Sequence, residues 1–281
     1  MKLGSLFSGS GTAELAAQMC GIEPVWASEI EPFAIAVTKK NFPDMKHVGS
    51  ILDIKGDELE PVDIICGGSP CQDLSVAGAQ KGLKDGERSH LFFEMVRIIK
   101  EMRQATNWQK PRFVIWENVC GAYGSQKGED FYEVIKQFCK IADSSVNVPR
   151  PEGRGSSNKL TWRYAGSILG NGWSLSWRTV DAQYWGVPQR RRRIYMILDL
   201  ASENANETIF NDGGDWYTGE APKEPMITKL ADILELDADP KYNLSAKACN
   251  GILNRAEKRG KEMPVMLKDA LEEVVNGSVG T

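Results

Sequence analysis

The chain has 281 residues with a formal net charge of −4, and 42% of them are apolar. This length suits one large domain or a large and a small one, and no apolar run approaches the roughly 20 residues of a membrane span. The six cysteines lack paired spacing and only two histidines are present, which argues against a zinc site and a disulfide scaffold and favours reduced thiols in a cytoplasmic setting.

Short apolar runs alternate with helical patterns through the first 200 residues. The runs that we expect to form strands are 2–7, 24–29, 47–51, 62–66 and 112–117. The segments that we expect to form helices are 12–20, 32–41, 89–103 and 130–141. This alternation predicts an α/β fold with a doubly wound, mainly parallel, Rossmann-like sheet covered on both faces.

The rest of the chain is less regular. Residues 143–159 are polar and rich in Gly, Pro and Ser, which is typical of a surface loop. Two apolar runs, 173–180 and 193–200, are expected to form a returning pair of strands. Beyond residue 200 the chain is polar, with helices expected near 245–259 and 264–275. We therefore predict one domain over 1–200 and a small, irregular C-terminal region over 201–281.

Polar stretches directly follow several predicted strands. They are residues 8–11 within FSGSGT (7–12), Glu29, Ser50 to Asp53, GGSPCQDLS (67–75) and Glu117–Asn118. Ligands bind outside the carboxyl ends of the strands in an open parallel sheet, so these stretches are expected to converge on one edge. The glycine turn and Glu29, twenty residues after Gly9, suit a nucleotide-like ligand. Taken alone, they fit a tight turn and a surface glutamate equally well.

Cys71 is the candidate nucleophile. A lone cysteine is usually a small buried hydrophobe, but the Gly, Ser and Pro around Cys71 favour exposure, and Pro70 gives the thiol a defined direction. No histidine lies beside it in the sequence, which disfavours a cysteine-protease arrangement and suits a reaction in which the electrophile itself is activated. Glu117 ends an apolar strand and is a candidate proton donor; in isolation, a surface or capping glutamate is the better interpretation.

Four arginines stand together in GVPQRRRR (186–193). A solvated charge run is often the better interpretation of such a cluster. This run enters a predicted strand, where alternate residues share a face. We therefore expect Arg191 and Arg193 to point to one side and Arg190 and Arg192 to the other, so that one pair reaches the site and the other meets phosphates.

Taken in order, these stretches resemble the motifs of the cytosine-C5 DNA methyltransferase family. The resemblance implies that S-adenosylmethionine is the cofactor and double-stranded DNA the partner, with a flipped-out cytosine attacked at C6 by Cys71. The implied catalytic residues are Pro70, Cys71, Glu117, Asn118, Gln189, Arg191 and Arg193. The implied cofactor residues are Phe7, Ser8, Gly9, Gly11, Thr12, Glu29, Ile30, Ser50, Ile51 and Pro70.

The sequence departs from the family pattern in two places. The family offers an aspartate to the adenine amino group, whereas Ser50 stands at the aligned position and Asp53 follows three residues later. After Arg193 we find neither an Arg-rich Gln-Gly-Phe-Pro stretch nor a terminal Gly-Asn-x-Val. We therefore expect a truncated or split recognition half, weak methylation by this chain alone, and a second polypeptide that carries the missing motifs.

Two alternatives to DNA methylation stay open. A relative of this family modifies transfer RNA, so an RNA cytosine-C5 methyltransferase with the same core is one of them. The other is a DNA-binding remnant without catalysis, against which the presence of Cys71, Glu117 and the arginine run weighs. The basic segment 244–261 is compatible with phosphate contacts, but a solvated helix beginning after Ser245 is the preferred interpretation.

Overall fold

The structure is a computed structural model. It describes residues 1–69, 91–151, 153–154, 159–187, 189–211, 224, 226 and 243–277. The chain divides into two compact units, Met1–Thr228 and Lys229–Thr281. The predicted boundary at residue 200 lies inside the first of these units.

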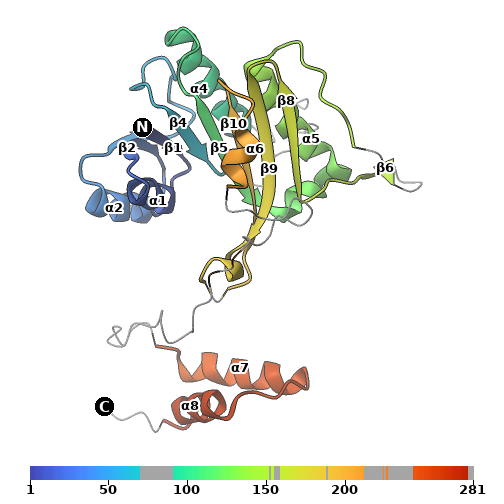
Figure 1. The fold of residues 1–281 in the computed structure, drawn as a ribbon. Coiled ribbons are helices and arrows are strands. Elements are labelled where there is room, and N and C mark those ends of the chain that lie inside the picture. The colour runs from blue at the N-terminus through green and yellow to red at the C-terminus, as the bar shows by residue number, and fades with distance from the viewer. Residues whose placement is uncertain are drawn as a thin grey trace, which may run out of the picture. The chain divides into compact units, whose positions relative to one another are not determined.

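The first unit is built on one eight-stranded sheet of order β3-β2-β1-β4-β5-β10-β9-β8 (Figure 1). Its strands are β1 (Lys2–Leu6), β2 (Glu23–Ser28), β3 (Lys46–Gly49), β4 (Ile64–Gly67), β5 (Phe113–Val119), β8 (Ala165–Gly170), β9 (Trp173–Asp181) and β10 (Arg192–Asp199). The pairs from β3 to β5 are parallel, and those from β5 to β8 are antiparallel. The sheet is therefore mixed, and its parallel half confirms the predicted Rossmann-like core.

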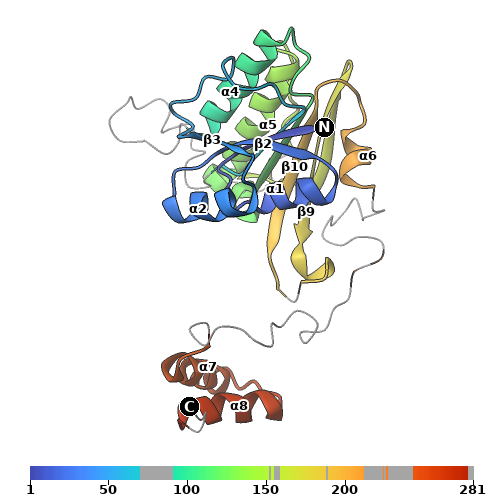
Figure 2. The ribbon, with the colours of Figure 1, turned by 90° about the vertical axis from the view of Figure 1, so that its left-hand side faces the viewer.

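Helices cover both faces of the sheet (Figure 2). On one face lie α4 (Leu91–Ala105) and α5 (Glu129–Ala142), whose apolar stripes form the main core with the inward side chains of the strands. On the other face α1 (Thr12–Met19) packs through Ala17 against Leu3 and Ile64. The helix α2 (Pro32–Asn41) begins with the predicted proline at its first position, where the missing N–H costs nothing.

The segments that the sequence left irregular contribute to this unit. The strand β8 and the helix α6 (Ala205–Ile209) were not predicted, and Ile209 and Phe210 form a small core with Ala165. Arg178, which is buried, donates a hydrogen bond of 2.9 Å to the carbonyl of Ile209. These contacts explain why the compact unit continues past residue 200.

Within 143–159, Val148 is buried, and its carbonyl accepts a 3.2 Å hydrogen bond from the hydroxyl of Tyr132. This stretch is therefore not only a polar surface loop. The two short strands β6 (Gly153–Arg154) and β7 (Lys159–Leu160) pair with each other in a separate sheet.

The described part of the second unit is a pair of helices, α7 (Ala246–Lys258) and α8 (Val265–Val275). Both were predicted, and the hydroxyl of Ser245 caps α7 by accepting a 3.3 Å hydrogen bond from the backbone N–H of Ala248. Cys249 and Leu271 are the buried side chains of the two helices. Across the described residues, no helix combines the length and the apolar character needed to cross a membrane.

Candidate functional site

The turn between β1 and α1 leaves room for a ligand at the carboxyl end of the sheet. Gly9 and Gly11 have φ values of 56° and 88°, in the left-handed region that glycine adopts without strain. A Cβ on Gly11 would lie 2.8 Å from the ring of Phe42, whereas a Cβ on Gly9 would meet nothing within 4 Å. Gly11 is thus required by packing, and the backbone at Gly9 borders open space. Thr12, the first residue of α1, is exposed.

Glu29 is held beside this turn by three backbone N–H groups. Its carboxylate accepts hydrogen bonds of 2.8 Å from Gly9, 2.8 Å from Ile30 and 2.9 Å from Glu31. Burial raises the pKa of Glu29, but the three hydrogen bonds outweigh burial, and the net pKa lies below its ordinary value. Glu29 is therefore an anion at neutral pH, in a fixed position next to the glycine turn.

The end of β3 adjoins the same region. The hydroxyl of Ser28, at the end of β2, donates a 2.8 Å hydrogen bond to the carbonyl of Gly49. Ser50 follows directly, Ile51 is buried and Asp53 is exposed. The predicted cofactor residues that the structure describes are therefore brought together at one edge of the sheet.

The strand β5 connects this edge to the segment that precedes Cys71. Trp116 and Asn118 face the buried side of β5: the indole N–H of Trp116 donates to the hydroxyl of Ser69 over 3.2 Å, and the amide of Asn118 donates to the carbonyl of Ser69 over 3.0 Å. Ser69 is thus held by two side chains of the neighbouring strand. Pro70 and Cys71 lie outside the described residues.

Glu117 lies between Trp116 and Asn118 on the opposite face of β5. Its carboxylate is 3.0 Å from the Nε of Arg193 on β10, and the two side chains keep 33% and 21% of their exposure. On the other side, a Cβ on Gly68 would approach the Oε2 of Glu117 to 3.0 Å. The glycine before Ser69 therefore leaves the space that the carboxylate occupies.

The predicted alternation is confirmed for Arg192 and Arg193, the first two residues of β10, whereas Arg190 and Arg191 precede the strand. Arg193 faces Glu117, whereas the guanidinium of Arg192 lies 4.7 Å from the centre of the Tyr164 ring. Arg191 is exposed, and its backbone N–H donates to the carboxylate of Asp181 over 3.1 Å. Gln189 is also exposed. The structure thus brings Arg193 to Glu117. Gln189 and Arg191 lie just before β10, and no contact of either with the carboxylate of Glu117 is described.

Several residues of this edge were missed by sequence reasoning. Tyr195 lies directly opposite Glu117 in the β5–β10 pair; burial, and then the charge of Glu117, raise the pKa of its phenol. Burial also raises the pKa of Glu14, which accepts a hydrogen bond from Ser5 beneath the glycine turn. Period-two alternation from Arg193 to Tyr195 is the signal that points to Tyr195; the sequence holds no comparable signal for Glu14.

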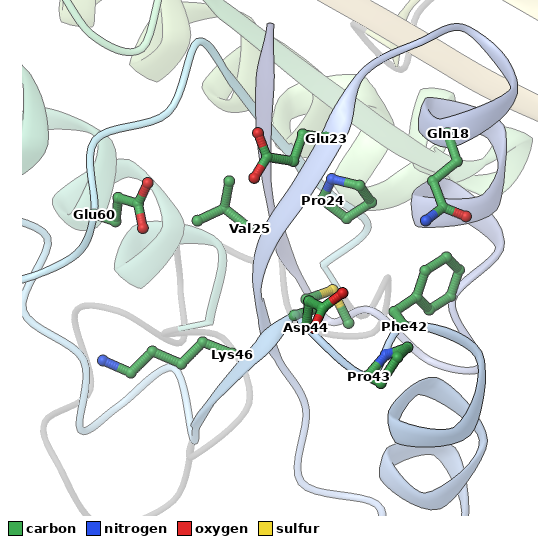
Figure 3. A pocket seen from close by; sticks show the side chains of 10 residues that line it. Gln18, Glu23, Pro24, Val25, Phe42, Pro43, Asp44, Lys46 and Glu60 are labelled. Carbon is green, nitrogen blue, oxygen red and sulfur yellow. The ribbon is translucent and has the colours of Figure 1, made fainter.

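A surface hollow of about 310 Å³ lies elsewhere, beside β2 and β3 (Figure 3). Its lining residues are Gln18, Glu23, Pro24, Val25, Phe42, Pro43, Asp44, Met45, Lys46 and Glu60. None of them is a predicted site residue. Within the described residues, no group of three or more His, Cys, Asp and Glu side chains is arranged to hold a metal ion.

The bond between Trp116 and Ser69 gives a testable prediction. Trp116→Phe removes the indole N–H and leaves a buried hydroxyl unpaired, which we expect to cost about 1–3 kcal/mol of stability. Because Ser69 directly precedes Pro70 and Cys71, we also expect turnover at saturating substrates to fall by about ten-fold, through lost positioning. Thermal unfolding and the turnover number measure the two effects.

Trp26 supplies the matched control. It is equally buried, and its indole N–H donates to the carbonyl of Glu60 over 3.0 Å, near the hollow. Trp26→Phe should lower stability by a similar amount and leave turnover unchanged, and Ser69→Ala should reproduce the kinetic loss of Trp116→Phe. Equal turnover in both tryptophan variants would show that the bond is structural only.

The sequence of the chain is similar to those of known methyltransferases. The family model described as C-5 cytosine-specific DNA methylase matches residues 1–142 and 162–279. The chain is 31% identical over 223 residues to the "DNA N-6-adenine-methyltransferase" of Escherichia phage P1, covering 73% of this chain and 29% of that protein. It is 32% identical over 202 residues to "Type II methyltransferase M.HhaI" of Haemophilus parahaemolyticus, covering 71% of this chain and 50% of that protein.

The chain thus spans half or less of the length of these two curated relatives. Among solved structures, it is similar to the Dnmt2 methyltransferase of S. pombe with a TM-score of 0.56 and 17% identity, over 91% of this chain and 65% of that one. At this identity the likeness shows a shared fold and nothing about the substrate.

Proposed function

Because the chain belongs to the C-5 cytosine-specific DNA methylase family, we propose that it transfers a methyl group from S-adenosylmethionine to C5 of a cytosine in double-stranded DNA. The observation that carries the proposal is the pair of Glu117 and Arg193, which lies beside the residue that leads into Pro70–Cys71. An acid, a cation and a thiol are the groups that nucleophilic attack on a pyrimidine requires, and the first two lie beside the residue that leads into Cys71 in the sequence.

The described residues fit the cofactor. The hydroxyl of Ser8 is buried with no hydrogen-bond partner among them, Glu29 is a fixed anion, and the side chain of Ile30 is 72% exposed. A carboxylate offers about four acceptor sites, so Glu29 keeps capacity for a ribose hydroxyl beyond its three backbone donors. Ile30 would pack against the adenine.

The remaining cofactor residues are assigned from the family motifs. They are Phe7, Gly9, Gly11 and Thr12 of the first turn, and Ser50, Ile51 and Pro70. Bound S-adenosylmethionine supplies an electrophilic methyl group. Ser50 and Asp53 are the two candidates for the adenine amino group, and alanine substitution of each tests them by its effect on cofactor affinity.

The chemistry proposed for this chain begins with a cytosine rotated out of the duplex. The Cys71 thiolate adds to C6, which makes C5 nucleophilic, and Glu117 hydrogen-bonds N3 and stabilises the charge that the addition creates. After C5 is methylated, loss of its proton restores the ring and expels the thiolate. Pro70 directs the thiol, and Asn118 positions the Cys71 segment through Ser69.

Three further side chains would hold the substrate. Arg193 uses its Nε for Glu117, and a guanidinium has five N–H donors, so donors remain for the base O2. Arg191 would bind a nearby phosphate, and Gln189 would anchor the same strand. The exposure of Gln189 and Arg191 supports these roles.

Transfer of labelled methyl groups tests the proposal. We expect the purified chain to label duplex DNA, with 5-methylcytosine as the product after digestion. Labelling of RNA alone would favour the RNA alternative, N6-methyladenine would favour the activity named for the phage P1 relative, and no labelling despite DNA binding would favour the remnant.

A further inference from the structure

The site edge of the sheet continues beyond Glu117 along the antiparallel strands. Because β10 runs antiparallel to β5, β9 to β10 and β8 to β9, the beginnings of β10 and β8 lie at the same edge as the end of β5 (Figure 1). Arg192 begins β10 and Tyr164 directly precedes β8. The short helical turn η3 (Ser125–Gly128), which follows β5, lies at this edge as well.

Two exposed cations lie along this part of the edge, Lys127 in η3 and Arg163 next to Tyr164. Neither makes an ion pair within the described residues. The acidic groups nearby are already engaged: Glu129 is bound by both terminal nitrogens of Arg150, at 2.8 and 2.9 Å, and Asp130 is buried with a hydrogen bond from Ser125. Among the described residues, Lys127 and Arg163 therefore have no carboxylate paired with them.

The two cations belong to one surface because the segments that carry them are tied together. The indole N–H of Trp162 donates a 2.9 Å hydrogen bond to the carbonyl of Gly128, which links the residue before Arg163 to the residue after Lys127. Lys127 is held at φ 60°, in the left-handed region that costs a non-glycine residue roughly 1 kcal/mol. Strained backbone residues cluster at ligand-binding sites, so the strained backbone of Lys127 favours a ligand contact there.

Tyr164 joins these cations to the arginine run. Its ring is 43% exposed and lies beneath the guanidinium of Arg192. Cations interleaved with an exposed aromatic side chain are typical of surfaces that bind nucleic acid. The family model leaves one internal stretch unmatched, residues 143–161, which directly precedes Trp162.

We propose that Lys127, Arg163, Tyr164 and Arg192 form a flanking surface that binds backbone phosphates of duplex DNA beside the target cytosine. The inference rests on the proposed function and adds a second contact region to it. From β5 to β8 there are three spacings between neighbouring strands, so the flanking surface extends about 14 Å from β5 at roughly 4.8 Å per spacing. At about 3.4 Å per nucleotide, this corresponds to phosphates roughly four nucleotides from the target.

The test measures the affinity for duplex DNA at a series of salt concentrations. Fluorescence anisotropy of a labelled random-sequence duplex reports the binding. We expect Lys127→Glu with Arg163→Glu to weaken binding on the order of ten-fold and to make the dependence of log K on log salt shallower by about two. Lys39→Glu with Lys40→Glu changes the net charge equally on two exposed residues of α2. This control should bind duplex as the unchanged chain does. If the double reversal does not fold, Lys127→Gln with Arg163→Gln should give the same shallower slope.

The outcomes separate the two proposals. Equal affinity and equal salt slope in the flanking variant and the unchanged chain would overturn the flanking surface while leaving the function intact. Loss of affinity in the Lys39/Lys40 control to the same degree would also overturn it, because net charge alone would then explain the effect. Failure of the unchanged chain to bind duplex DNA at all would instead count against the proposed function.

Discussion

Replacement of Cys71 by alanine is expected to abolish methyl transfer, with a loss of about four orders of magnitude or more, as for removal of other enzyme nucleophiles. The reason is that without the thiolate no bond forms at C6, and C5 of cytosine stays a poor nucleophile. Duplex containing 5-fluorocytosine provides a direct readout, since fluorine at C5 cannot leave as a proton does. The unchanged chain should accumulate a covalent complex, visible after denaturing electrophoresis, and Cys71→Ala should not.

Cys66 is the matched control, five residues earlier in the same segment. Burial, followed by the charges of Glu14 and Glu117, raises the pKa of the Cys66 thiol to about 12, so Cys66 stays protonated at neutral pH and is no nucleophile. Cys66→Ala should therefore keep both turnover and trapping, apart from a packing cost. A covalent complex that persists in Cys71→Ser and disappears in Cys66→Ala would show that Cys66 is the nucleophile. That result would contradict our proposal.

Replacement of Glu117 by glutamine should have the next largest effect. The amide keeps the size of the side chain but cannot supply the proton or carry the charge, so we expect turnover to fall by about 10²–10⁴-fold, the usual contribution of a general acid. Affinity for duplex DNA should change far less, because the charged donors of Arg191 and Arg193 remain. Steady-state kinetics together with duplex binding measure the two quantities.

Glu129 offers a control for this change. It also pairs with an arginine, Arg150 at 2.8 Å, but the proposed chemistry gives it no role. Glu129→Gln should leave turnover within about two-fold of the unchanged chain, since an exposed ion pair contributes little to stability. If Glu117→Gln were equally mild, Glu117 would be a structural partner of Arg193 and no acid.

Much of this fold could be predicted because its signals are local. The helix α2 was predicted at its observed bounds, since Pro32 and the residues before Pro43 mark its ends. The convergence of Glu29 and the glycine turn was predicted from the rule for parallel strands, and the 2.8 Å bond from Gly9 to Glu29 confirms it. The opposite faces of Arg192 and Arg193 followed from the period of two in a strand.

What could not be predicted depends on contacts between distant segments. The strand β8 alternates only weakly and forms because it pairs with β9 along its full length. The helix α6 has five residues, too few for a periodic pattern, and is held by Arg178 and by the core around Ala165. The bond from Trp116 joins β5 to Ser69, two residues beyond the end of β4, and no local sequence pattern predicts this contact. The roles of Cys71 and its neighbours stay predictions, because residues 70–90 lie outside the described part of the chain.

The pairing of β5 with β10 has a consequence for the order in which the protein folds. Glu117 and Arg193 lie on adjacent strands, yet the chain between them holds α5, β8 and β9. Closing so long a loop is entropically costly, and contacts of large sequence separation form late. During synthesis, β1 to β5 can assemble before Arg193 has been made. A chain folded only as far as β5 therefore has the edge that holds Glu29 but lacks the pair of Glu117 and Arg193, and under the proposed function we expect it to be inactive.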